Sequence, residues 1–100
     1  MSDYCLNLLC PRAAEEHVVD TLLAIGETGV FASVCARAHG LAPNELSTSE
    51  QVSGRSGATL VQALVSKHRL PSLVVRLHGD LARSGVRFWI TPVIQHGAFE

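Results

Sequence analysis

A polar run near the middle of the sequence, Glu50-Gln51-Val52-Ser53-Gly54-Arg55, carries side chains that could bind a ligand. The guanidinium of Arg55 suits a carboxylate or a phosphate, and Glu50 could hold a cation or pair with Arg55. We therefore consider five residues as a candidate ligand- or partner-binding site: His39, Glu50, Gln51, Gly54 and Arg55. In the alternative interpretation, Gly54 only turns the chain and Arg55 makes a structural salt bridge between subunits.

The histidines and cysteines are candidate ligands for a metal ion. No HxxxH or HxH spacing occurs, and no Cys/His pair has the spacing of a zinc finger. Cys35 and His39 are four residues apart, which separates them by roughly 13 Å along a strand. One chain can present both to a single ion only if the strand ends between them. A copper or zinc site shared between subunits stays open, with His39, Cys35 or His96 as ligands.

Enzyme chemistry is not indicated by the sequence. There is no GxSxG nucleophile motif, and Cys10 and Cys35 lie in apolar runs, where burial raises the pKa of a thiol. The three cysteines also lack CxxC spacing, so we expect Cys5, Cys10 and Cys35 to be reduced thiols that fill a core or an interface. We therefore expect a protein that is not an enzyme.

Composition disfavours several classes of partner. The net charge of −1 at pH 7 gives no broad basic surface for nucleic acid or for an anionic membrane. The apolar stretches are far shorter than the roughly 20 residues of a membrane span, and the N-terminal residues do not resemble a signal peptide. We therefore expect a cytoplasmic protein without direct membrane insertion. With 47% hydrophobic and 17% charged residues, part of the apolar surface should face another subunit.

Two strands and a helix are predicted in the first part of the chain. Residues 4–10 suit a strand, which Pro11 ends while opening the first turn of a helix. That helix ends near Gly26 and carries a buried stripe at helical spacing: Val18, Val19, Leu22, Leu23 and Ile25. Residues 30–36 form the second strand, which is apolar on both faces.

A long connection is predicted over residues 39–57. This segment is rich in Gly, Ser, Asn, Pro and Glu, and shows little periodicity. Connections of this length in a compact domain are usually functional or disordered. It contains most of the candidate ligand site.

The remaining residues predict a strand, a helix and a closing strand. Residues 59–66 alternate as a strand, and Pro71 suits the start of a helix over 70–81. The buried stripe of that helix consists of Leu70, Leu73, Val74, Leu77 and Leu81. Residues 86–93 form the last strand, and Pro92, which lacks an N–H, places its end at a sheet edge or ends its pairing.

The order β-α-β-β-α-β predicts one α+β domain over residues 1–100 with a ferredoxin-like fold. Such a fold has a four-stranded antiparallel sheet with two helices on one face. The strands nevertheless carry apolar residues on both faces, although a water-facing side should alternate with polar residues. A homo-oligomer that stacks its sheets is the simplest explanation.

The chain resembles a group of uncharacterised PII-like proteins, catalogued as a domain of unknown function. The similarity extends over the whole length and is carried by His39-Gly40, Leu46-Ser47, the SEQVSGR run at 49–55 and the FWITPV run at 88–93. The resemblance implies a homotrimer whose sheets face inward. The 39–57 connection would then correspond to the T-loop of PII proteins, through which they engage transporters or enzymes.

The resemblance also bears on ligands and partners. PII proteins bind adenine nucleotides in clefts between subunits, and members of the narrower group are often associated with heavy-metal efflux systems. The chain lacks the loop tyrosine of PII proteins, since its only tyrosine is Tyr4, and it lacks their glycine-rich phosphate-contacting motif. ATP binding is therefore not carried over. The ligand stays open between a divalent or cuprous metal ion and a small-molecule effector.

Three hypotheses follow from these patterns. The first is a PII-like regulatory sensor, a homotrimer that signals through the 39–57 connection to a transporter or another partner. The second is a copper- or zinc-binding trimer similar to CutA proteins. The third is a module that docks on its partner through the same connection without any ligand.

Overall fold

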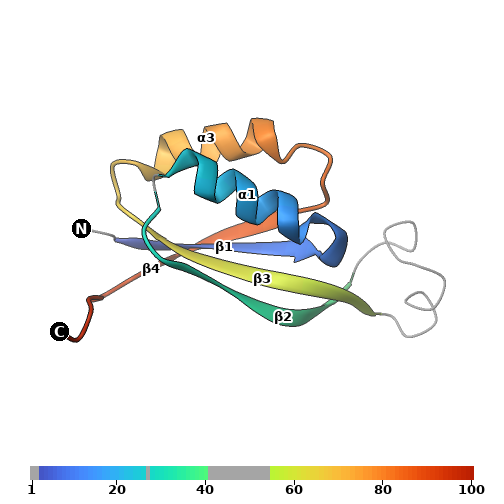
Figure 1. Ribbon diagram of the computed structural model, residues 1–100, viewed down its shortest axis with the longest axis horizontal. Coiled ribbons are helices and arrows are strands. Elements are labelled where there is room, and N and C mark those ends of the chain that lie inside the picture. The colour runs from blue at the N-terminus through green and yellow to red at the C-terminus, as the bar shows by residue number, and fades with distance from the viewer. Residues whose placement is uncertain (1–2, 27, 41–54) are drawn as a thin grey trace.

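The computed structural model describes residues 3–26, 28–40 and 55–100 of the chain. The elements follow the predicted β-α-β-β-α-β order (Figure 1). They are β1 (Tyr4–Pro11), the 3-10 helix η1 (Arg12–Ala14), α1 (Glu15–Ile25), β2 (Phe31–His39), β3 (Arg55–Val65), α3 (Leu70–Asp80) and β4 (Arg87–Pro92). The predicted ferredoxin-like α+β fold is confirmed.

The strands form one antiparallel sheet in the order β2-β3-β1-β4. The central strand β1 pairs on both sides, so that Asn7 lies opposite Gln62 of β3 and Trp89 of β4. Both helices cover the same face of this sheet (Figure 1). β4 is an edge strand and ends at Pro92, which confirms the prediction that Pro92 marks an edge or a strand end.

The two helices begin and end where local chemistry favours it. Glu15 and Glu16 lie in the first turn of α1, where acidic side chains complement the helix dipole. The helix stops because Gly26 adopts a left-handed φ of 69°, and its N–H donates to the carbonyl of Leu22 at 3.2 Å. Pro71 lies in the first turn of α3. No helix in the described residues is long and apolar enough to cross a membrane.

The hydrophobic core lies between the two helices and the sheet. It consists of alternate residues of β1 and β3 and the inward stripes of the helices: Leu6, Leu8, Cys10, Val18, Leu22, Val61, Val65, Leu73, Leu77 and Leu81. The predicted stripe is wrong at Leu23, which is exposed. The reason is geometric, since one residue turns a helix by about 100° and moves Leu23 away from the buried Leu22.

The two strands of the β2–β3 hairpin are longer than the sequence predicted. β2 continues to His39 and β3 begins at Arg55, and the register pairs these two residues with each other. The connection predicted over 39–57 is therefore shorter at both ends, and residues 41–54 lie outside the described residues. The prediction failed because the ends of the hairpin are polar, and pairing with the neighbouring strand does not require apolar alternation.

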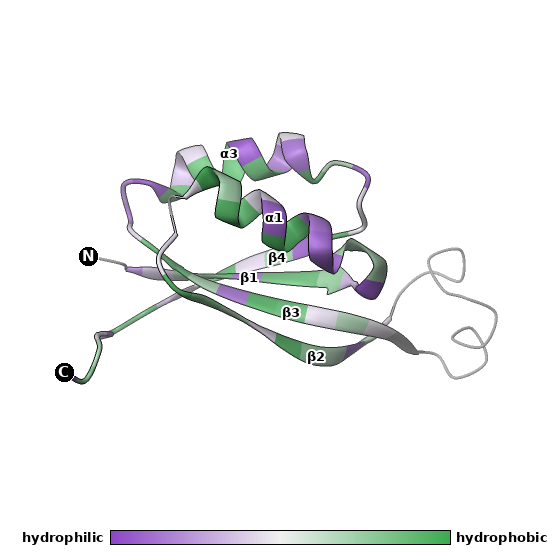
Figure 2. Ribbon diagram, viewed as in Figure 1, coloured by the Kyte–Doolittle hydropathy of each residue, from purple (hydrophilic) through white to green (hydrophobic). Residues whose placement is uncertain are grey.

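Hydropathy differs between the helices and the strands. Figure 2 shows hydrophilic and hydrophobic residues on different sides of α1 and α3, whereas β1 is mostly hydrophobic along its length. Alternate residues of a strand point to opposite faces of the sheet. The sheet therefore has apolar side chains on the face that no helix of this chain covers, which we call the open face.

Candidate functional site

The candidate ligand residues from the sequence are only partly described by the structure. Glu50, Gln51 and Gly54 lie outside the described residues. His39 is exposed at the end of β2, and Arg55 starts β3 directly opposite it. The structure thus brings the backbones of His39 and Arg55 together at the base of the β2–β3 connection.

The candidate metal ligands do not meet within one subunit. β2 continues through both Cys35 and His39, so the strand keeps these two side chains apart. His96 follows β4, which is at the other edge of the sheet (Figure 1). Within residues 3–26, 28–40 and 55–100, no three His, Cys, Asp or Glu side chains are grouped to hold a metal ion. A site shared between subunits stays a prediction.

Cys35 does not fill the core, and its predicted packing in an interface stays a prediction. Its side chain is exposed, whereas Cys10 is fully buried and Cys5 is half-buried. Cys35 shares the helix-covered side of the sheet with its partner in the register, the buried Thr59. It lies on the edge strand, however, where less of the structure covers it. Cys35 is therefore not part of the core of the single subunit.

A cavity of about 240 Å³ lies where β2 and β3 approach the undescribed connection. Leu9 of β1, Ala38 of β2 and Gly57 of β3 contribute to its wall, together with the turn between α3 and β4. We call it the loop-end cavity. Because Ala38 precedes His39 and Gly57 follows Arg55 closely, a molecule in this cavity would lie beside both strands that lead into the connection.

Two arginines line the loop-end cavity, and the turn after α3 positions them. Arg83 has a φ of 63°, in the left-handed region that non-glycine residues rarely adopt, and Gly85 has a φ of 79°. The hydroxyl of Ser84 donates to the carbonyl of Leu81, which fixes the turn. Arg83 and Arg87 then both lie at the cavity.

A third arginine lies against the same wall. The guanidinium of Arg12 packs on Gly57, so closely that a Cβ at this glycine would be 3.2 Å from the guanidinium carbon. No Asp or Glu is among the described residues that line the cavity. Guanidinium groups bind carboxylates and phosphates in a two-pronged geometry. The cavity is therefore suited to a small anion, or to the anionic part of a larger ligand.

Cys10 contributes to the loop-end cavity without being a reactive nucleophile. Burial, with a smaller contribution from the Glu15 carboxylate, raises the pKa of its thiol to about 11. The thiol therefore stays protonated at neutral pH, and thiolate is the reactive form. The prediction of a raised thiol pKa in an apolar strand is confirmed for Cys10.

Sequence reasoning missed the arginines of the loop-end cavity. Arg12 is far from Arg83 and Arg87 in the sequence, and only the fold brings the three to one end of the molecule. A local signal was present in Arg83-Ser84-Gly85, since a helix followed by a serine and a glycine indicates a tight turn. That signal predicts the position of the turn, but it does not predict that the turn lines a cavity.

The open face has a polar centre within apolar surroundings. Asn7 is only 3% exposed, although it lies on this face. Its amide nitrogen donates to the carbonyl of Trp89 at 3.3 Å and to the hydroxyl of Thr91 at 3.3 Å. Its oxygen accepts a hydrogen bond from the amide nitrogen of Gln62 at 3.0 Å. Apolar side chains surround this network on the same face: Leu9, Val34, Leu60, Leu64 and Trp89.

Comparison with known protein families assigns the chain to one of them. Residues 1–100 match the family described as "Protein of unknown function (DUF3240)". The chain belongs to the DUF3240 family. A crystal structure of a DUF3240 family protein from Shewanella baltica OS155 has a TM-score of 0.80 with this chain at 16% identity, covering 100% of this chain and 99% of that one. No curated protein sequence matches.

Other solved structures relate the DUF3240 fold to PII proteins. CPII, a nitrogen regulatory PII-like protein from Thiomonas intermedia K12 bound to ADP, AMP and bicarbonate, has a TM-score of 0.70 at 13% identity, with 98% of each chain covered. The GlnK–ATP complex of B. subtilis has a TM-score of 0.65 at 12% identity, covering 92% of this chain and 82% of that one. The DUF3240 chain therefore has the fold of PII-like proteins, and the predicted resemblance to an uncharacterised PII-like family is confirmed.

Proposed function

We propose that this DUF3240 protein is a PII-like regulatory protein. It is a homotrimer that binds a small anionic effector in the loop-end cavity and signals through the β2–β3 connection to a transporter or another partner. The position of the cavity is the observation that carries this proposal. Ala38 and Gly57 are part of its wall and belong to the two strands that lead into the connection.

The effector would act on the β2–β3 connection by binding more tightly to one conformation of the protein than to another. A ligand shifts a conformational equilibrium only by as much as it prefers one conformation over another. An anion held by Arg83 and Arg87 would touch the ends of both strands, and so would favour the arrangement of the connection that leaves the cavity intact. A partner that reads the connection would then sense the effector.

The ligands of proteins with the same fold support an anionic effector. The CPII structure is described as bound to ADP, AMP and bicarbonate, and the GlnK structure as an ATP complex. All of these ligands are anions at neutral pH, and arginine forks bind such groups. We therefore include bicarbonate and the adenine nucleotides among the candidate effectors, although the chain lacks the glycine-rich motif of PII proteins.

The open face supports self-association. Val34 and Trp89 are exposed there, beside the half-buried Leu60 and Leu64. Soluble monomers rarely expose several large apolar side chains on one face. A homotrimer that packs these faces against each other would bury them. The heavy-metal efflux system suggested by the sequence resemblance is the setting that we propose for the partner.

Native mass spectrometry combined with calorimetry tests the proposal. The purified protein is measured alone and with bicarbonate, AMP, ADP, ATP, copper and zinc, so that oligomeric mass and bound ligand are read together. We expect a trimer that binds at least one of the anions. Arg83→Gln and Arg87→Gln should each weaken that binding by at least about tenfold, because each removes a charge-assisted contact.

A matched arginine provides the control. Arg76 lies on α3 and makes an exposed ion pair with Asp80 at 3.8 Å, away from the cavity lining. Arg76→Gln should leave anion binding unchanged. A trimer that binds none of the anions, or that binds one equally well in all three variants, would contradict the proposed effector site. Tight copper or zinc binding alone would instead support the metal hypothesis.

A further inference from the structure

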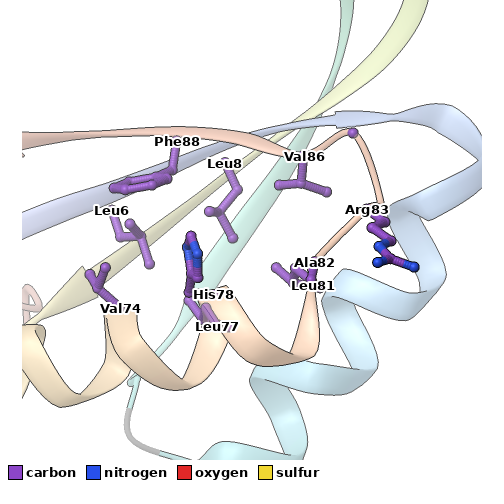
Figure 3. Close-up of a pocket in the computed structure, with 11 residues that line it drawn as sticks. Leu6, Leu8, Val74, Leu77, His78, Leu81, Ala82, Arg83, Val86 and Phe88 are labelled. Carbon is purple, nitrogen blue, oxygen red and sulfur yellow. The ribbon is translucent and has the colours of Figure 1, made fainter. Parts of the chain in front are cut away.

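A second cavity lies on the helix-covered side of the sheet, between α3 and the edge strand β4. Its volume is about 350 Å³, and Figure 3 shows side chains of the helix and of the sheet on its two sides. Most of its lining is apolar, and the residues that matter here are Leu6, Val74, Leu77, His78, Val86 and Phe88. We call it the α3–β4 groove. Its size and apolar lining are those of a site that binds an apolar group.

The segment after β4 presents apolar side chains that contact little of its own subunit. Ile94 and Phe99 are both fully exposed, and they are the most exposed large hydrophobic side chains among the described residues. The segment runs away from the body of the domain (Figure 1). A phenylalanine left in water forgoes the favourable free energy of burying its ring. The same chain therefore has an apolar groove and, after β4, exposed apolar side chains that could fill such a groove.

We infer that residues 93–100 of one copy dock in the α3–β4 groove of a neighbouring copy, with Phe99 in the cavity. This inference rests on the self-association in the proposed function, but it concerns a different surface. The open face and the groove are on opposite sides of the sheet. The tail would therefore add a second contact between subunits that the open face already holds together.

The charged side chains at the groove and the direction of the chain after β4 both favour residues 93–100 of a neighbouring copy as the segment that binds there. His78 lies at the groove, as does Arg83, which also lines the loop-end cavity. Glu100 follows Phe99, so a docked tail brings a carboxylate toward these side chains. The tail leaves β4 at Pro92, whereas the groove extends to Val86 before the start of that strand. Because the chain continues outward beyond Pro92, a neighbour's groove is the natural target for Phe99.

Photocrosslinking in the full-length protein tests the inference. In a Phe99→p-benzoylphenylalanine variant, the crosslinker keeps an aromatic ring at the docking position. We expect a crosslinked species of twice the subunit mass on a denaturing gel, with the crosslink in peptides that contain α3 or the start of β4. The same crosslinker at Val75, which is exposed on α3 and does not line the groove, should not reach those groove residues.

Truncation of the side chain measures the strength of the contact. Phe99→Ala should raise the subunit dissociation constant in analytical ultracentrifugation by about tenfold or more, since a buried phenyl group is lost at each interface. Val75→Ala should leave it unchanged. Neither change should unfold the subunit, because both side chains are exposed within it.

Several outcomes would overturn the inference. A crosslink of single-subunit mass would show that the tail folds back on its own groove. A crosslink on the open face, or a co-purified small molecule in the groove with no tail crosslink, would give the groove another role. A trimer with unchanged stability in Phe99→Ala would refute the tail contact but leave the proposed function standing. A protein that is monomeric at all concentrations would contradict both.

Discussion

The two faces of the sheet are formed by the same strands, but their side chains are packed differently. On the helix-covered face, Leu6 and Leu8 of β1 are sealed beneath α1 and α3 in a continuous apolar core. On the open face, the intervening residue Asn7 is the centre of a hydrogen-bond network, although apolar side chains flank it. The core on the first face is buried within one subunit. The second is apolar at its margins and polar at its centre, which is the reverse of the apolar core and polar rim of most protein interfaces.

The difference shows where stability and assembly are encoded. Substitutions on the covered face should change the stability of the subunit itself. Substitutions at the margins of the open face should change assembly and leave the subunit folded. Asn7 should affect both, because it is buried in the subunit and lies on the surface that we propose to be the interface.

Val34→Asp should have the largest effect, and on assembly alone. Val34 is exposed on the open face of β2, so the isolated subunit should lose no more than about 1 kcal/mol of stability. In a packed interface the new carboxylate would be buried without a partner, at a cost of several kcal/mol. Sedimentation velocity should show a shift from trimer to monomer, with the dissociation constant raised more than about a hundredfold.

Val75→Asp is the matched control for this substitution. Val75 is also an exposed valine, but it lies on the outer side of α3. Its replacement should leave the oligomer intact. If Val34→Asp remains a trimer, the open face is not the interface. Assembly would then not account for the apolar side chains on the open face.

Leu73→Ala should have the largest effect on the stability of the subunit. Leu73 is a residue of α3 and is fully buried in the core. Its truncation removes apolar burial and leaves a cavity, which together cost about 2–5 kcal/mol. Urea denaturation of the variant should show this loss, and Val75→Ala on the same helix should change stability by less than about 0.5 kcal/mol. A loss below about 1 kcal/mol would mean that the covered face is not tightly packed.

Asn7→Ala should have an intermediate effect. The change removes the hydrogen bonds that the buried Asn7 side chain makes to Gln62 and Thr91, whose own side chains are exposed in the subunit. Each hydrogen bond that is lost costs about 0.5–1.5 kcal/mol. Gln62→Ala should cost less, because the Gln62 side chain is exposed in the subunit. Urea denaturation below the concentration at which the protein assembles separates this effect from assembly, and an equal loss in both variants would count against a buried network.

Local patterns in the sequence predicted most of the fold. Hydrophobic spacing identified the inward side of α3 through Leu73 and Leu77, and Pro92 identified the end of an edge strand. The extension of β2 to His39 was not predicted, because this extension depends on pairing with Arg55 across the hairpin. A residue's partner on another strand is a property of the register, which one strand's sequence does not contain.

The candidate site was much harder to predict than the fold. His39 and Arg55 were predicted within the connection, whereas they end β2 and begin β3, and Arg83 and Arg87 come from a turn whose position depends on the packing of α3. The same is true of Asn7, which reads in the sequence as one polar residue interrupting a strand. Its role depends on Gln62 and Thr91, which only the register brings beside it.

The smallest effect that we predict concerns the thiol of Cys10 at alkaline pH. Burial raises the pKa of this thiol from 9.0 to about 11 in the folded protein. The unfolded chain therefore loses the proton first as pH rises, and the contribution to stability is full below pH 9 and disappears between pH 9 and about 11. The expected loss is on the order of 1–2 kcal/mol.

The comparison of Cys10→Ala with the unchanged protein isolates this contribution from the other groups that titrate in the same range. Urea denaturation at pH 8 and at pH 10.5 should show a steeper decline for the unchanged protein than for Cys10→Ala. Cys35→Ala is the control for the removal of a cysteine at an exposed position. Equal declines in the unchanged protein and in Cys10→Ala would mean that water reaches this part of the covered face, and that the two faces of the sheet are less different than their packing indicates.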